Sequence, residues 1–117
     1  MAEQELARTR RFLEHDDRFA AYCLESAVEM FLRAHCSAFG LVAPENVSLG
    51  DLARRVVSAQ PPDSIAACEE ITRHSAAARS GKGPGPRLED IRASLATIEP
   101  MLAEIREGIR SSTREET

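Results

Sequence analysis

Five basic residues lie close together in the second half of the chain and could bind a phosphate group. They fall within residues 73–87, which hold no acidic residue, in a chain of net charge −4. They are Arg73, His74, Arg79, Lys82 and Arg87. Arginine binds phosphate through its charge and through paired hydrogen bonds from the guanidinium. The alternative is that these groups pair with the 19 acidic residues or complement the C-terminal end of a helix.

The sequence lacks the residue patterns of a phosphate loop, a cysteine site and a di-iron site. Gly81-Lys82-Gly83 follows an expected helix and lacks the Walker spacing of a phosphate loop. The three cysteines have no C-x-x-C spacing, so we expect small buried hydrophobic residues: Cys23, Cys36 and Cys68. The histidines do not form the Glu-x-x-His pairs of a di-iron bundle: His15, His35 and His74. We therefore predict no metal site and no cofactor.

Two polar features of residues 18–39 have both a structural and a functional interpretation. Glu25, Glu29 and Arg33 are spaced four apart, which predicts a ladder on a solvated helix face. A partner helix or a second subunit could instead cover that ladder. His35 lies off the polar face, and we expect it to be a core histidine bonded to backbone, with an interface histidine as the alternative.

Residues 18–39 themselves predict a central helix, because they contain no glycine or proline and most positions are apolar. At about 100° per residue, the polar positions form one narrow stripe: Arg18, Glu25, Ser26, Glu29, Arg33 and Ser37. The remaining arc holds Phe19, Cys23, Leu24, Ala27, Val28, Met30, Phe31, Leu32, Ala34, Ala38 and Phe39. An arc this wide needs neighbours on several sides.

The helices before and just after this segment are predicted from end signals. Residues 2–16 form a polar helix with a thin apolar edge of Leu6, Phe12 and Leu13. Asp16-Asp17 offers an N-cap for the central helix. Gly40 is placed to end the central helix. Ser48 and Asp51 resemble a capping box that starts a short helix over residues 49–59.

The second half of the chain predicts two further helices. One begins at Asp63 or Ser64 and runs to about Arg79, and residues 80–86 form a flexible connection. The last has the most regular apolar seam: Leu88, Ile91, Leu95, Ile98, Leu102, Ile105 and Ile109. Pro100 should kink or divide it.

These elements and the composition predict one all-α domain. Four to five helices with short connections favour an antiparallel up-and-down four-helix bundle over residues 1–110, followed by a flexible tail over residues 111–117. The apolar runs are too short to span a membrane, and the charged N-terminus has no signal core. We therefore expect a cytoplasmic protein.

The pattern resembles the HEPN family of small helical domains over roughly residues 6–109. The long helix has a mid-helix glutamate, Glu29, and a basic residue four positions later, Arg33. A capped short helix follows at Ser48. The segment ITRHSAAARSG is similar to one with a histidine and, five residues on, an arginine, which here are His74 and Arg79. The tyrosines usual beside them are replaced by Ser75 and Ser80.

The resemblance implies a bundle that usually dimerises. Many members are ribonucleases with an arginine, four to six residues, and then a histidine in a cleft at the dimer interface. Other members lack this motif and bind partners, including small nucleotidyltransferases. In this chain no histidine follows Arg73 or Arg79 at that spacing, and Arg10 and His15 have it only in the first helix.

Three functions follow as expectations. The first is a non-catalytic, homodimeric HEPN-like bundle that binds a nucleotide, RNA or a protein partner, such as a small nucleotidyltransferase. The second is a HEPN ribonuclease toxin that uses His74 and Arg79. The third is a purely structural protein-interaction adaptor.

Overall fold

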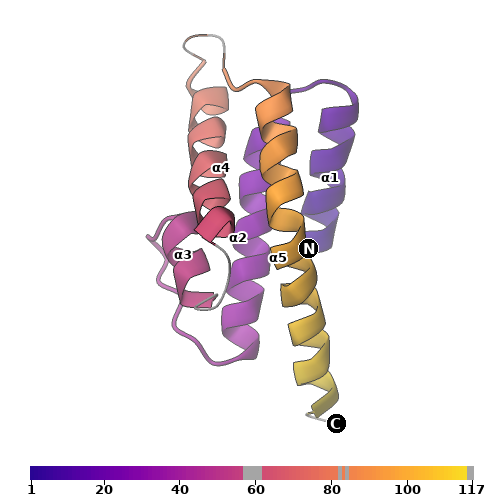
Figure 1. The fold of residues 1–117 in the computed structure, drawn as a ribbon, viewed down its shortest axis with the longest axis vertical. Coiled ribbons are helices and arrows are strands. Elements are labelled where there is room, and N and C mark those ends of the chain that lie inside the picture. The colour runs from indigo at the N-terminus through magenta and orange to yellow at the C-terminus, as the bar shows by residue number, and fades with distance from the viewer. Residues whose placement is uncertain (57–61, 82, 84, 116–117) are drawn as a thin grey trace.

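Five α-helices make up the fold in the computed structural model, which describes residues 1–56, 62–81, 83 and 85–115. No strand occurs within these ranges (Figure 1). The helices are α1 (Ala2–Glu14), α2 (Ala20–Ala38), α3 (Leu49–Val56), α4 (Pro62–Ser80) and α5 (Leu88–Glu115). The predicted all-α class is confirmed. The end predicted for the short helix, residues 57–59, lies outside the described residues.

Helix α2 is the centre of the molecule, as the width of its apolar arc predicted. It contacts all four other helices, and in Figure 1 it runs behind α5, with α4 on one side and α1 on the other. Its most deeply buried residues include Leu24, Val28 and Leu32, each at most 1% exposed. The prediction that the whole arc is buried fails at its two ends, where Phe19 and Phe39 are 42% and 46% exposed.

A tight turn separates α1 from α2, so the two helices are not continuous. Asp16 has a positive φ of 53°, a conformation that aspartate tolerates better than most residues. The Asp17 carboxylate accepts a hydrogen bond of 2.9 Å from the backbone N–H of Phe19. This bond belongs to the turn and does not cap the helix, because the N-cap of α2 is Phe19, which has no side-chain cap bond. The predicted aspartate cap is therefore wrong, and α2 begins at Ala20, two residues later than the predicted start at Arg18.

Helix α2 ends at the predicted glycine and is followed by a loop that Arg33 holds in place. Gly40 has a φ of 67°, and the N–H of Leu41 bonds the carbonyl of Cys36 at 2.8 Å, as in a Schellman cap. The Arg33 guanidinium bonds the Glu29 carboxylate at 2.9 Å. It also donates to the carbonyl oxygens of Ala43, Pro44 and Glu45.

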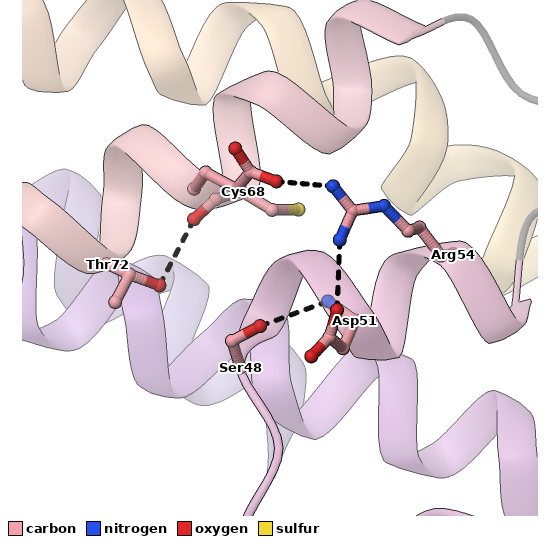
Figure 2. Close-up of polar contacts among 6 residues, drawn as sticks. Ser48, Asp51, Arg54, Cys68 and Thr72 are labelled. Carbon is pink, nitrogen blue, oxygen red and sulfur yellow. Dashed lines mark hydrogen bonds and ion pairs between the residues drawn. The ribbon is translucent and has the colours of Figure 1, made fainter.

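Helix α3 packs closely on α4 through one glycine and one arginine. A Cβ on Gly50 would lie 2.9 Å from Cγ of Glu69, so any other residue here would require the Glu69 side chain to move. Arg54 bonds Asp51 at 2.9 Å within α3 and Glu69 at 2.6 Å on α4 (Figure 2). Ser48 Oγ accepts the Asp51 N–H at 3.2 Å, which is the predicted cap of this helix.

Helix α5 buries the predicted seam but does not divide at its proline. Pro100 lies inside one continuous helix, on an exposed position, so its ring faces away from the core. Apolar residues on both sides of it pack into the same core: Ile91, Leu95, Ile98, Leu102 and Ile105. The helix also continues to Glu115, beyond the tail boundary predicted at residue 110.

No helix in the described ranges combines the length and the apolar character that a membrane crossing requires.

Replacing Phe31 with alanine tests the core around α2. Phe31 is 4% exposed, and truncating a buried aromatic costs about 3–5 kcal/mol through lost burial and a cavity. The free energy of unfolding, measured by urea denaturation, should fall by that amount. Phe39→Ala is the matched control, because Phe39 is the C-cap residue of the same helix but is 46% exposed. Equal losses for the two variants would contradict the placement of α2.

Candidate functional site

The basic residues predicted as a phosphate site are dispersed over separate contacts. Arg73 pairs with Glu70, and the His74 Nε2 lies 3.5 Å from the other carboxylate oxygen of Glu70. Arg87 pairs with Glu89. Lys82 lies outside the described residues. The described members thus contact carboxylates, which was the structural alternative for this cluster.

His74 and Arg79 lie on different sides of α4. Five residues along a helix correspond to a turn of about 140°. His74 lines a hollow between α4 and α5, and its side chain is 15% exposed. Arg79 instead reaches α2, where its Nη2 atom lies 3.9 Å from the Glu25 carboxylate. Within one chain, these two side chains do not face a common point.

Arg79 belongs to a different group of residues, in which two arginines and three aromatic rings form a continuous row. Its guanidinium carbon lies 5.6 Å from the centre of the Tyr22 ring. The Tyr22 and Phe19 rings are 5.2 Å apart, and Phe19 meets Phe12 edge to face at 5.3 Å. The Arg8 guanidinium carbon lies over the Phe12 ring, 5.8 Å from its centre. We call these five residues the ring array.

The turn between α1 and α2 positions the rings. The N–H of Asp17 bonds the carbonyl of Phe12 at 2.8 Å, and the Asp17 carboxylate bonds the N–H of Phe19. These two bonds hold Phe19 beside Phe12 where the chain reverses. Tyr22 follows Phe19 by three residues, so both lie on one side of the start of α2.

Glu25 aligns α4 with the ring array. Its carboxylate accepts a hydrogen bond of 2.9 Å from the Ser75 hydroxyl on α4, and Ser75 is fully buried. Arg79 follows Ser75 by four residues, one helical turn later. The bond between Glu25 and Ser75 therefore brings the Arg79 guanidinium above Tyr22.

Part of the ring array is exposed to solvent, and the charge of Arg8 is partly neutralised by a nearby glutamate. Phe19 and Tyr22 are 42% and 38% exposed, so solvent reaches part of each ring. Arg8 lies 3.6 Å from Glu5. Arg11 and His15 join Arg8 and Phe12 around a shallow hollow of about 250 Å³. The surface combines aromatic faces with several basic groups, the combination typical of single-stranded nucleic-acid binding.

The cysteines and His35 lie inside the fold rather than at a reactive surface. All three thiols are buried, and burial raises the pKa of Cys68 to about 11 and also raises that of Cys23. Burial lowers the pKa of His35, whose ring lies 4.6 Å from that of Phe39. The predicted bond from His35 to backbone is not found at its buried Nδ1, which has no hydrogen-bond partner.

Sequence reasoning assigned Phe12 and Phe19 to apolar packing and did not consider Tyr22 as a site residue. One signal was available, because three of the five aromatic residues of the chain (four Phe and one Tyr) lie between residues 12 and 22. The contribution of Arg79 to this surface depends on the packing of α4 against α2, which no local pattern shows.

Comparisons of the chain with protein-family models, with curated proteins and with solved structures gave no match.

Proposed function

We propose that the protein is a non-catalytic, HEPN-like helical bundle that binds single-stranded RNA through the ring array. In this proposal the four long helices form the antiparallel up-and-down bundle of that family. The observation that carries the function is the series of three contacting rings, two of them exposed and Phe12 partly buried, with an arginine over the ring at each end.

The chemistry of the ring array suits a single-stranded ligand. Unpaired bases can stack on exposed aromatic faces, and each such contact contributes about 1–3 kcal/mol. Arginine guanidinium groups contact phosphate oxygens and also stack on bases. Rings about 5 Å apart offer successive bases neighbouring surfaces, whereas the stacked bases of a duplex are not available to them.

A binding role is favoured over RNA cleavage by the positions of His74 and Arg79. A general acid or base must lie within hydrogen-bond reach of the reacting phosphate ester. His74 faces the side of α4 next to α5, while Arg79 faces Tyr22 on α2. The ribonuclease alternative would therefore need its arginine from a second subunit.

Variants of Tyr22 and Arg79 test RNA binding by fluorescence anisotropy of a labelled single-stranded oligoribonucleotide at low salt. Tyr22→Ala should weaken binding by about tenfold, through the loss of one stacking contact of about 1–3 kcal/mol. Tyr22→Phe should restore it, because the ring remains. Affinity should also fall as salt rises, since arginine contacts to phosphate release counterions.

The matched control for Arg79→Ala is Arg110→Ala. Both arginines are exposed, and each lies 3.9 Å from a glutamate, Glu25 and Glu107 respectively. Only Arg79→Ala should weaken binding. Equal losses in the two variants, or no binding by the unaltered chain, would overturn the proposal.

A second candidate function, a protein interface, is favoured by an apolar patch at the far end of α2. Phe39, Leu41 and Val42 are 46%, 42% and 73% exposed. The Phe39 ring lies against Gly108 on α5, 3.8 Å from where a Cβ would be. Contiguous exposed apolar side chains of this kind are typical of interfaces. We propose that a second copy of the chain covers this patch, with a small nucleotidyltransferase as the alternative occupant.

Sedimentation equilibrium tests the homodimer. The unaltered chain should give about twice its monomer mass of 12.8 kDa, and Val42→Glu should give the monomer because a carboxylate would be buried in the interface. Ala96→Glu, at an exposed position of α5 outside the patch, should remain dimeric. A monomer at every concentration of the unaltered chain would rule out the homodimer.

A further inference from the structure

His35 has the one buried polar side-chain atom for which the described residues offer no hydrogen-bond partner. This atom is Nδ1 of the imidazole ring. Buried polar groups are normally hydrogen-bonded, and each exception calls for an explanation. The residue is half-buried in the last turn of α2, where its ring lies against that of Phe39, with 4.6 Å between the two ring centres. His35 therefore adjoins the apolar patch of Phe39, Leu41 and Val42.

The two ring nitrogens of His35 are in different surroundings. Nε2 also forms no hydrogen bond with any residue that the structure describes, but it is not buried, so it reaches solvent. Burial lowers the pKa of His35, so the ring is neutral at pH 7 and carries a single N–H. On Nδ1 this proton would make a buried donor without an acceptor, whereas on Nε2 it can bond water or a partner. The exposed edge of His35 thus presents one N–H donor beside the apolar patch.

The loop that carries the exposed apolar residues is held in place by Arg33. Its guanidinium donates to three consecutive carbonyl oxygens, those of residues 43–45. The Glu29 carboxylate bonds the same guanidinium at 2.9 Å, so the arginine is itself held on α2. Leu41 and Val42 directly precede these carbonyls and remain 42% and 73% exposed. Side chains that are ordered in advance lose less entropy on binding, which favours a docking surface over incidental exposure.

The chemistry of this surface suits a second copy of the chain. A two-fold interface brings the same patch of both copies together, so the patch must be complementary to itself. Its side chains and the neutral His35 carry no charge, so two chains of net charge −4 can meet there without like charges in contact. The same end of α2 also supplies acceptors. The carbonyl oxygens of Ser37 and Ala38 accept no hydrogen bond from a described residue, as is usual in a last helical turn.

We propose that His35 is a binding residue of the homodimer, whose Nε2–H donates to a carbonyl oxygen at the end of α2 in the second copy. This inference rests on the homodimer proposed above and names the polar contact within it. Apolar contacts alone are non-directional, whereas a hydrogen bond requires a restricted geometry. By two-fold symmetry the bond forms twice, so the pair of His35 contacts fixes how the two copies are oriented.

The dimer dissociation constant of the full chain, from sedimentation equilibrium, tests this role with two amide variants. The amide nitrogen of glutamine reaches the position of Nε2, whereas that of asparagine reaches the position of Nδ1. His35→Gln should therefore keep the dissociation constant within about threefold, and His35→Asn should raise it about tenfold. His35→Leu should also raise it about tenfold, although leucine makes the patch more apolar. The control is His74→Leu, at a half-buried histidine of α4 outside the patch, which should leave the constant unchanged.

Long-range ¹H–¹⁵N NMR of the unaltered protein at neutral pH gives a second readout that needs no variant. The ring nitrogens of His35 should show the pattern of a neutral ring protonated on Nε2, and a ring protonated on Nδ1 would overturn the inference. A dimer that His35→Leu leaves as tight as before, or that His35→Gln weakens as much as His35→Leu, overturns this inference alone. A chain that is monomeric at every concentration overturns it together with the homodimer and leaves the apolar patch to a different protein.

Discussion

The burial of α2 is the constraint on which the rest of the structure depends. One helix contacts all four others, so most of its circumference is committed to packing and only a narrow polar stripe faces outward. α1 and α4 border that stripe. Side chains of both helices therefore reach the start of α2, where Phe12 contacts Phe19 and Arg79 lies over Tyr22. The proposed binding surface is thus a consequence of how the core is formed.

Helical periodicity was sufficient to predict which residues form the core. It did not predict how far along each helix its neighbours extend. The seam of α5 and the apolar arc of α2 were predicted because a 3.6-residue period fixes the direction of each side chain. The period does not show where a neighbouring helix ends. Phe39 lies near the end of α2, and its ring is exposed although its direction on the helix is apolar. Pro100 did not divide α5 because packing on both sides of it holds one helix together.

The candidate site was harder to predict because its residues are distant in sequence. Residues 73–87 are basic as a segment, yet Arg73, His74 and Arg87 each contact a glutamate three, four or two positions away. Neighbouring glutamates therefore pair with three of the basic residues that the local pattern predicted as a phosphate site. Arg79 gained a different role from α2, through Tyr22 and the Glu25–Ser75 bond. Local ion pairs thus account for three of these residues, and a tertiary contact accounts for Arg79.

Intrinsic fluorescence offers the most direct measurement of the central claim, that the ring array contacts RNA bases. Tyr22 is the single tyrosine in a chain without tryptophan, so tyrosine emission reports on this one ring. Adding a short single-stranded oligoribonucleotide to the unaltered protein should quench the emission saturably, with a midpoint that moves to higher RNA concentration as salt rises. Emission that stays constant while the same oligoribonucleotide binds would contradict the account.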